Sequence, residues 1–133
     1  MKRARVLLAD DHADVAELLK TILETDFEVV AVVASGAALL TAAESLRPDA
    51  IVTDIVMPGM DGLTATAALI ERTPDARIVL VTAQEEKGVQ RRGLASGALG
   101  FVVKFRAGDD LLPAVHAALR GEPFVGARTA RSN

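Results

Sequence analysis

The sequence predicts an α/β fold built on a five-stranded parallel sheet with helices on both faces. Short apolar runs rich in Val and Ile recur five times along the 133 residues, as expected of strands buried on both faces. Each run is followed by a stretch in which apolar residues return every three or four positions, the spacing of an amphipathic helix. Because strand and helix alternate throughout, right-handed helical crossovers must connect the strands, and strands connected in this way run parallel.

The five predicted strands are short and almost entirely aliphatic. The third is followed at once by an aspartate, the fourth by a threonine and the last by a lysine, and the first is followed by Ala9 and then by two aspartates. This pattern indicates strands that pass through a core and end at a polar edge. The predicted strands are Val6–Leu8, Val29–Val33, Ala50–Thr53, Ile78–Val81 and Phe101–Val103.

Five helices are predicted between and after these strands. Four have a clear apolar stripe, and they lie within residues 15–24, 39–46, 63–70 and 112–119. The remaining helix, Glu85–Ser96, has the weakest pattern, because Val89 and Leu94 are its only large apolar residues and Gly88 and Gly93 interrupt it. It is therefore the helix expected to move most easily.

The end of the chain has no periodic pattern. Asp109 or Asp110 is the predicted cap of the last helix, with Pro113 in its first turn, where a missing N–H costs little. After Gly121 the periodicity stops. We expect one domain over residues 1–122. Residues 123–133 are expected to form a flexible tail, or the start of a linker to an output domain absent from this chain.

The composition excludes several classes of function. Half of the residues are hydrophobic and the only aromatic residues are four Phe, so the core must be aliphatic and no surface for stacking bases is available. The net charge of −3 argues against a domain built to bind the DNA backbone. Without Cys there are no disulfides or thiolate metal sites. With no apolar run long enough for a membrane or a signal peptide, a cytoplasmic location is expected.

Three acids lie at predicted strand ends. Asp10 and Asp11 follow the first strand, and Asp54 follows the third. In an open parallel sheet, ligands bind beyond the carboxyl ends of the strands, at the switch point of the strand order. If these two strands are neighbours, as in a 2-1-3-4-5 order, the carboxylates converge. Like charges this close favour a bound cation, and hard oxygen ligands in an open pocket suit Mg²⁺.

A hydroxyl and a lysine join the same predicted edge. The fourth strand ends at Thr82 and the fifth at Lys104. Acids, a cation, a hydroxyl and an ammonium group suit phosphoryl transfer, which depends mainly on positioning and charge neutralisation. His12 and His116 are the only histidines and lie far apart in the sequence. They are expected to face solvent or to be helix residues, and not to be ligands. The nucleophile would then have to be a carboxylate.

Each of these residues alone has a simpler explanation. Asp10 or Asp11 could cap a helix, and Asp54 could be a turn residue before the turn-rich "PGMDG". Asp61, in that turn, is interpreted only as a turn residue. Thr82 could be structural and Lys104 could be a solvated charge. The combination of all of them on one β-α chain favours the functional interpretation.

The motifs resemble the receiver domain of bacterial two-component response regulators. They are "LLADDH" at 7–12, "DIVMPGMDG" at 54–62, "VTA" at 81–83 and "GFVVK" at 100–104. Each motif is weak by itself, but their order and spacing are specific and cover roughly residues 4 to 122. The resemblance implies a flavodoxin/CheY-like (βα)5 fold with strand order 2-1-3-4-5. "GFVVK" and "AALRGEPF" are most similar to receivers attached to LuxR-type helix-turn-helix transcription domains.

The resemblance implies a role for each residue that matches the receiver pattern. Asp54 would accept a phosphoryl group from a sensor histidine kinase. Mg²⁺ would be held by Asp10, Asp11, Asp54 and the backbone carbonyl of Val56. Thr82 and Lys104 would contact the phosphoryl group, and Phe101 would be the aromatic residue that turns inward on activation. Activation would favour a homodimer or control an output domain for transcription regulation.

Two other functions are compatible with an aspartyl nucleophile or with this fold. A Mg²⁺-dependent phosphatase or hydrolase usually has a second acid two residues after the nucleophile, but this chain has Val56 there, which cannot transfer a proton. A pseudo-receiver that no longer takes phosphate is disfavoured by the complete set of acids, Thr and Lys. We therefore expect a switch that phosphorylates and dephosphorylates itself and is not a turnover enzyme. We expect no direct contact of this domain with nucleic acid or membrane.

Overall fold

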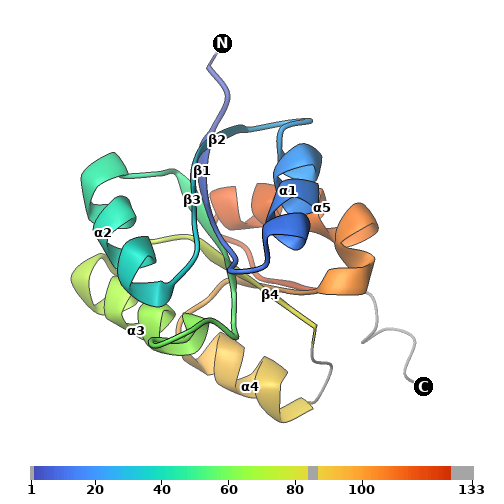
Figure 1. The fold of residues 1–133 in the computed structure, drawn as a ribbon. Helices are drawn as coiled ribbons and strands as arrows, with labels where there is room; N and C mark the ends of the chain where they lie inside the picture. The colour runs from blue at the N-terminus through green and yellow to red at the C-terminus, as the bar shows by residue number, and fades with distance from the viewer. Residues whose placement is uncertain (1, 84–86, 127–133) are drawn as a thin grey trace.

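A parallel sheet forms the middle layer of the computed structural model, which describes residues 2–83 and 87–126 (Figure 1). The strand order is β2-β1-β3-β4-β5-β6, and every paired strand is parallel. The predicted α/β class and order are thus confirmed, with one additional strand at the edge. The strands are β1 Arg5–Ala9, β2 Glu28–Val33, β3 Ala50–Asp54, β4 Ile78–Thr82, β5 Gly100–Val103 and β6 Phe124–Val125.

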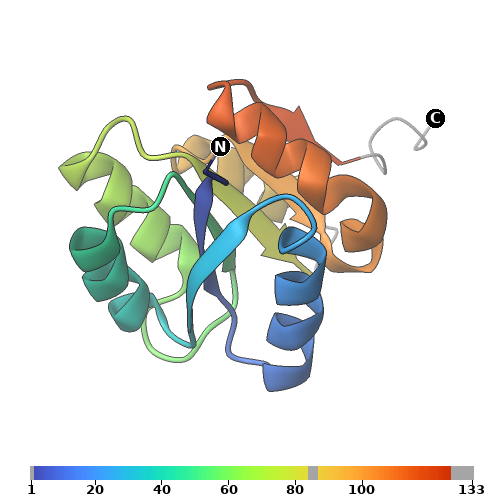
Figure 2. The same cartoon turned by 90° about the horizontal axis from the view of Figure 1, so that it is seen from above.

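Helices cover both faces of this sheet (Figure 2). On one face lie α1 (Ala13–Leu23) and α5 (Ala107–Leu119). The other face is covered by α2 (Gly36–Leu46), α3 (Gly62–Arg72) and α4 (Lys87–Ala95). Among the described residues, no helix combines the length and the apolar composition needed to cross a bilayer.

The core is divided by the sheet into two aliphatic halves. Side chains of a strand alternate between faces, so Leu8 packs toward α1 and α5 while its neighbour Leu7 packs toward α2 and α3. In β3, Val52 packs on the α1 and α5 face and Ile51 on the α2 and α3 face. This alternation explains why consecutive positions in the middle of β1 and β3 are apolar: both faces of the sheet are covered.

The sixth strand differs from the expected tail. Phe124 N–H donates to Leu99 O at 2.9 Å and Gly126 N–H donates to Phe101 O at 3.0 Å, so the chain after α5 pairs with the free edge of β5. A two-residue strand after Gly121 and Pro123 has no detectable sequence period, which explains why the sequence predicted a loop. Residues 127–133, the rest of the predicted tail, lie outside the described residues.

The last helix begins earlier than predicted. A short 3₁₀ helix, η1, spans Lys104–Arg106 and leads directly into α5, whose N-cap is Arg106 and not Asp109 or Asp110. Pro113 consequently lies inside α5. Asp110 is buried in the first turn of this helix, and Arg106 Nε lies 3.6 Å from its Oδ2. The sequence did not show this start, because η1 contributes no apolar periodicity.

Candidate functional site

Four neighbouring strands deliver polar residues to one edge of the sheet. Asp54 is the last residue of β3 and Thr82 the last of β4, while Asp10 and Lys104 directly follow β1 and β5. The register aligns Ala9 with Thr53, and Asp54 with Val81. Because the strands are parallel and in register, their carboxyl ends meet at the same edge. The structure thus brings the predicted Asp, Thr and Lys residues together.

Lys104 bridges two of the acids. Its Nζ donates a hydrogen bond to Asp54 Oδ2 at 3.0 Å and forms an ion pair with Asp10 Oδ2, also at 3.0 Å. The Asp10 contact does not have hydrogen-bond geometry, so Asp10 Oδ2 remains a buried oxygen without a hydrogen bond in the described part of the chain. Burial lowers the pKa of Lys104, but the contacts with Asp10 and Asp54 outweigh it and raise the pKa above its usual range. Lys104 is therefore a firmly held cation.

Asp54 is nearly enclosed, with 3% of its surface exposed. Burial raises its pKa above the usual range of an aspartate, and the nearby Asp10 charge adds to this, while Lys104 and the backbone N–H of Ile55 oppose it. Lys104 and the Ile55 N–H thus offset only part of the cost of keeping this buried carboxylate ionised. A poorly solvated carboxylate at a strand end is a suitable nucleophile, and it also benefits from an added cation.

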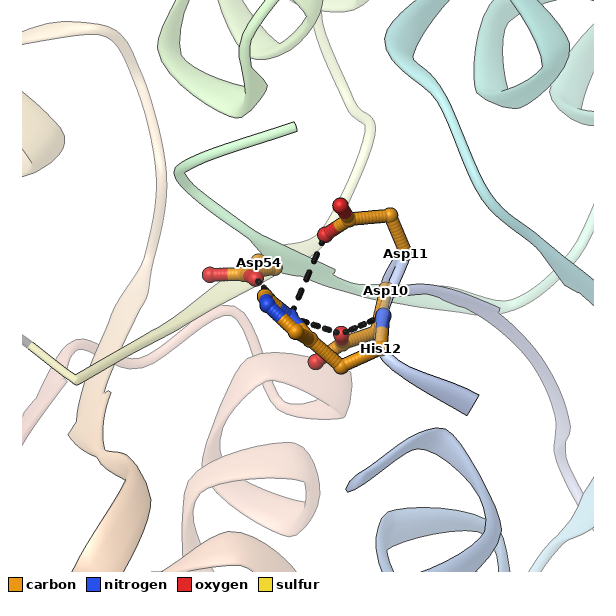
Figure 3. A group of neighbouring side chains, drawn as sticks. All are labelled: Asp10, Asp11, His12 and Asp54. Carbon is orange, nitrogen blue, oxygen red and sulfur yellow. Dashed lines mark hydrogen bonds and ion pairs between the residues drawn. The ribbon is translucent and has the colours of Figure 1, made fainter. Parts of the chain in front are cut away.

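Asp11 and His12 complete the cluster from the loop after β1 (Figure 3). His12 Nδ1 lies 3.3 Å from Asp10 Oδ1, 3.3 Å from Asp11 Oδ1 and 4.0 Å from Asp54 Oδ2. The backbone N–H of His12 also donates to Asp10 Oδ1 at 2.8 Å. The sequence predicted a solvent-facing histidine; its side chain is 60% exposed, yet its ring contacts the acids. Its position directly after Asp11 at a strand end was the signal for this.

The loop between β3 and α3 is fixed by two local interactions. Asp61, interpreted from the sequence as a turn residue only, is the N-cap of α3, and its side chain accepts from Thr64 N–H at 2.8 Å. Gly62 N–H donates to Ile55 O at 2.7 Å and closes the loop. Val56 lies in this loop, two residues after Asp54, with 55% of its surface exposed.

Thr82 and Phe101 are both 1% exposed. Phe101 packs in the core on the α4 side, where Gly93 leaves room for its ring: a Cβ at Gly93 would lie 3.3 Å from Phe101 Cδ2 and 2.8 Å from Leu80 Cδ1. The aromatic side chain that was expected to turn inward on activation is thus already inward in this structure. Its role in switching stays a prediction.

The acidic cluster has the dimensions that one divalent cation needs. One ligand atom from each of Asp10, Asp11, His12 and Asp54 lies within 4.8 Å of the others. Ligands about 2.1 Å from an octahedral ion lie roughly 3 Å apart when adjacent and roughly 4 Å apart when opposite. Three carboxylates supply hard oxygen donors, and Asp10 Oδ2 is buried without a hydrogen bond in the described part of the chain. These residues fit Mg²⁺; the Val56 carbonyl as a further ligand stays a prediction.

Comparison with known proteins agrees with this geometry. Residues 6–116 match the family described as "Response regulator receiver domain". LiaR of Bacillus subtilis, a transcriptional regulatory protein, is 34% identical over 128 residues, which are 95% of this chain and 61% of LiaR. The oxygen regulatory protein NreC of Staphylococcus epidermidis is 35% identical over 91% of this chain and 57% of NreC. This chain thus spans about 60% of the length of these regulators.

Proteins of receiver length are similar over their whole length. CheY of Listeria monocytogenes, a chemotaxis protein, is 32% identical over 87% of this chain and 98% of CheY. The receiver domain of the putative response regulator NarL from Mycobacterium tuberculosis superposes with a TM-score of 0.86 at 30% identity, covering 92% of this chain and all of that domain. A LuxR-family response regulator from Aurantimonas superposes with a TM-score of 0.92 at 28% identity, covering 98% of this chain and 94% of that one. On the match over residues 6–116, this chain belongs to the response regulator receiver domain family.

Proposed function

We propose that this chain is a phosphorylation-controlled switch whose Asp54 accepts a phosphoryl group from a sensor histidine kinase. The observation that carries the proposal is the environment of Asp54. It is a nearly enclosed carboxylate at a strand end, with Lys104 Nζ at 3.0 Å and two further acids beside it. Attaching phosphate to such a group changes the charge at the meeting point of four strands.

The proposed step is a displacement at phosphorus. An oxygen of Asp54 forms a bond to phosphorus while the bond from phosphorus to the donor histidine nitrogen breaks, and that nitrogen keeps the electron pair. The Lys104 ammonium group, now held by Asp54 and Asp10, can then contact the phosphoryl oxygens, as can the Thr82 hydroxyl at the end of β4. Mg²⁺ held by Asp10, Asp11, Asp54 and the Val56 carbonyl would neutralise charge on those oxygens.

A turnover hydrolase is a poorer fit to the site. The position two residues after Asp54 is Val56, whose exposed aliphatic side chain cannot act as a general acid or base. The family to which the chain belongs consists of signalling regulators. A cytoplasmic location, a homodimer in the activated state and control of transcription through an output domain are parts of the same proposal.

Incubation with acetyl phosphate and Mg²⁺ tests the proposal directly. Intact-mass measurement should show one added phosphoryl group, and fragmentation should place it on Asp54. The same incubation with excess EDTA should show little labelling, because the charge of the three acids is then not neutralised. Labelling on another residue, or equal labelling in EDTA, would contradict the proposed site.

Mg²⁺ binding is expected to depend more on Asp11 than on Asp10. Asp10 is buried, with Oδ1 accepting from the His12 N–H and Oδ2 in an ion pair with Lys104, whereas Asp11 is more exposed and contacts His12 Nδ1. Calorimetric Mg²⁺ titration should therefore show a larger loss of affinity in Asp11→Asn than in Asp10→Asn. The reverse order would show that Asp10 is the dominant ligand.

The phosphorylated form is expected to lose its phosphate slowly. Val56 is exposed, lies two residues after Asp54 and cannot orient an attacking water. Val56→Asn should shorten the phosphoryl half-life severalfold, which mass spectrometry after removal of the donor can follow. Val56→Ile, which keeps an aliphatic side chain, is the matched control and should change the half-life little. Gln84, the second residue expected to border the water path, lies outside the described residues.

Phosphorylation is expected to change the surface formed by α4, β5 and α5. In the described part of α4, Gly93 packs directly over Phe101, so movement of the aromatic ring and of the helix are coupled. Hydrogen exchange with and without beryllofluoride, a phosphoryl mimic, should show its largest differences between residues 87 and 119. Differences confined to α1 would exclude this surface as the switch.

A further inference from the structure

His12 places a nitrogen donor among the oxygen donors of the acidic cluster. Its Nδ1 lies 3.3 Å from one oxygen of Asp10 and 3.3 Å from one oxygen of Asp11, and Asp54 Oδ2 follows at 4.0 Å. These separations match the spacing of ligands around one small ion, roughly 3 to 4 Å. The imidazole is therefore not merely near the cluster: its nitrogen stands where a fourth ligand would stand (Figure 3).

No other interaction of His12 requires its ring in this position. His12 is the N-cap residue of α1, but its side chain makes no capping hydrogen bond. The ring is 60% exposed, so packing does not hold it either. Its backbone is held without the ring, because its N–H donates to Asp10 Oδ1 and its carbonyl accepts from Ala16 N–H. Removing the imidazole therefore leaves the backbone of the loop and the start of α1 intact, which makes the side chain's contribution measurable.

Imidazole and carboxylate ligands select different ions. Mg²⁺ prefers an all-oxygen shell and keeps several waters. An imidazole nitrogen adds affinity for borderline ions such as Co²⁺, Ni²⁺ and Zn²⁺, and Ni²⁺ exceeds Co²⁺ in the usual order of affinities. A site with three carboxylates and one imidazole is thus expected to bind Ni²⁺ and Co²⁺ more tightly than three carboxylates would.

We propose that His12 is a ligand of this site that shifts its selectivity from Mg²⁺ toward borderline transition-metal ions. The proposal rests on the proposed function, in that the same acids are taken to hold the cation. It adds that the identity of the bound ion is set by a residue outside the carboxylate set.

The test compares Ni²⁺ and Mg²⁺ affinities of the tag-free chain with those of three variants. Calorimetric titrations near pH 8, where imidazole is ordinarily neutral, are made on wild type, His12→Ala, His116→Ala and Asp11→Asn. His116 is the other histidine of the chain and pairs with Asp26 Oδ2 at 2.8 Å, away from the acidic cluster, so its variant controls for histidine binding elsewhere.

In His12→Ala, the Ni²⁺ affinity should fall by about tenfold or more, whereas the Mg²⁺ affinity should change by less than about twofold. His116→Ala should change neither affinity at the acidic site. The Co²⁺ complex of the wild type and of His116→Ala should also show a contact-shifted, exchangeable imidazole proton in its NMR spectrum, which His12→Ala lacks.

The possible failures are distinguishable. Equal changes of Ni²⁺ and Mg²⁺ affinity in His12→Ala, or no change in either, would overturn the ligand role of His12, as would persistence of the shifted imidazole proton. If Asp11→Asn leaves Mg²⁺ binding intact, the role of Asp11 as a Mg²⁺ ligand in the proposed function is wrong. Loss of both ions in Asp11→Asn, with loss of Ni²⁺ alone in His12→Ala, supports both conclusions.

Discussion

Asp54→Asn is expected to abolish phosphoryl uptake from acetyl phosphate and, in the absence of divalent cations, to make the fold more stable. The first effect follows because the amide has no nucleophilic oxygen equivalent to the carboxylate. The second follows because burial and Asp10 raise the pKa of Asp54, so its ionised form costs folding free energy that Lys104 only partly offsets. Removing the charge should raise the unfolding free energy at pH 7 by about 1 kcal/mol.

The pH dependence of this stability gain follows from the direction of the pKa shift. An aspartate whose folded pKa lies above its unfolded value of about 3.9 destabilises the fold only where it is ionised. The advantage of Asp54→Asn should therefore be full at neutral pH. It should shrink as the pH falls through the folded pKa and vanish below the unfolded one. Mg²⁺ should reduce the difference in unfolding free energy between Asp54→Asn and the wild type at pH 7, because the ion compensates the charge of Asp54 in the wild type.

Asp61→Asn is the matched control for this prediction. Asp61 lies in the loop after β3 and caps α3 through its side chain, a task that Asn performs equally well. This variant should still be labelled by acetyl phosphate at Asp54. Urea unfolding across the pH range and intact-mass measurement check both effects. Undiminished labelling of Asp54→Asn, or its lower stability at pH 7 without Mg²⁺, would contradict the environment described for Asp54.

Gly62→Ala is expected to destabilise the fold by about 3 kcal/mol, at the upper end of overpacking substitutions. A Cβ at Gly62 would lie 2.1 Å from Asp54 O and 3.0 Å from Ile55 Cα, so it meets backbone that cannot rotate away. The hydrogen bond from Gly62 N–H to Ile55 O at 2.7 Å would be disturbed as well. Because this contact lies directly behind Asp54, phosphoryl uptake should fall together with stability.

Gly108→Ala provides the comparison for Gly62→Ala. Gly108 also lies in the first turn of a helix, but a Cβ there has nothing within 4 Å. It should stabilise α5 by roughly 0.5–1 kcal/mol, since Ala is the better helix former. Urea unfolding followed by circular dichroism measures both variants. Similar stabilities for the two would show that the close approach at Gly62 is not a constraint.

Local interactions account for most of what the sequence did not reveal. Asp61 lies in a segment with the composition of a turn, so the sequence predicted a turn residue. Its role as a helix cap depends on where α3 begins. The sequence placed the start of α5 too late, because η1 adds a helical turn that contains no apolar residues at helical spacing. The sixth strand consists of two residues, which is too short for a recognisable pattern. It forms because it pairs with the free edge of β5, which is distant in the sequence.

The sequence by itself determined the fold class and the composition of the site. Continuous apolar strands alternating with amphipathic helices allow one arrangement, a parallel sheet covered on both sides, and parallel strands carry their terminal residues to a common edge. Asp10, Asp54, Thr82 and Lys104 could therefore be expected at one edge of the sheet, and their convergence followed if the strands had the 2-1-3-4-5 order that the resemblance implied. The prediction of a common edge depends on hydrophobic periodicity and on the order of strands and helices along the chain, which are properties of the sequence.

Only the tertiary structure decided how these groups interact. The ion pairs of Lys104 with two acids, the raised pKa of Asp54, the inward position of Phe101 and the approach of His12 to the carboxylates depend on distances and burial. Electrostatic energies change steeply with separation and with exclusion of water, and neither quantity is encoded in residue order. The sequence thus predicts which residues are candidate ligands and the candidate nucleophile, whereas packing of the strand ends sets their charge balance.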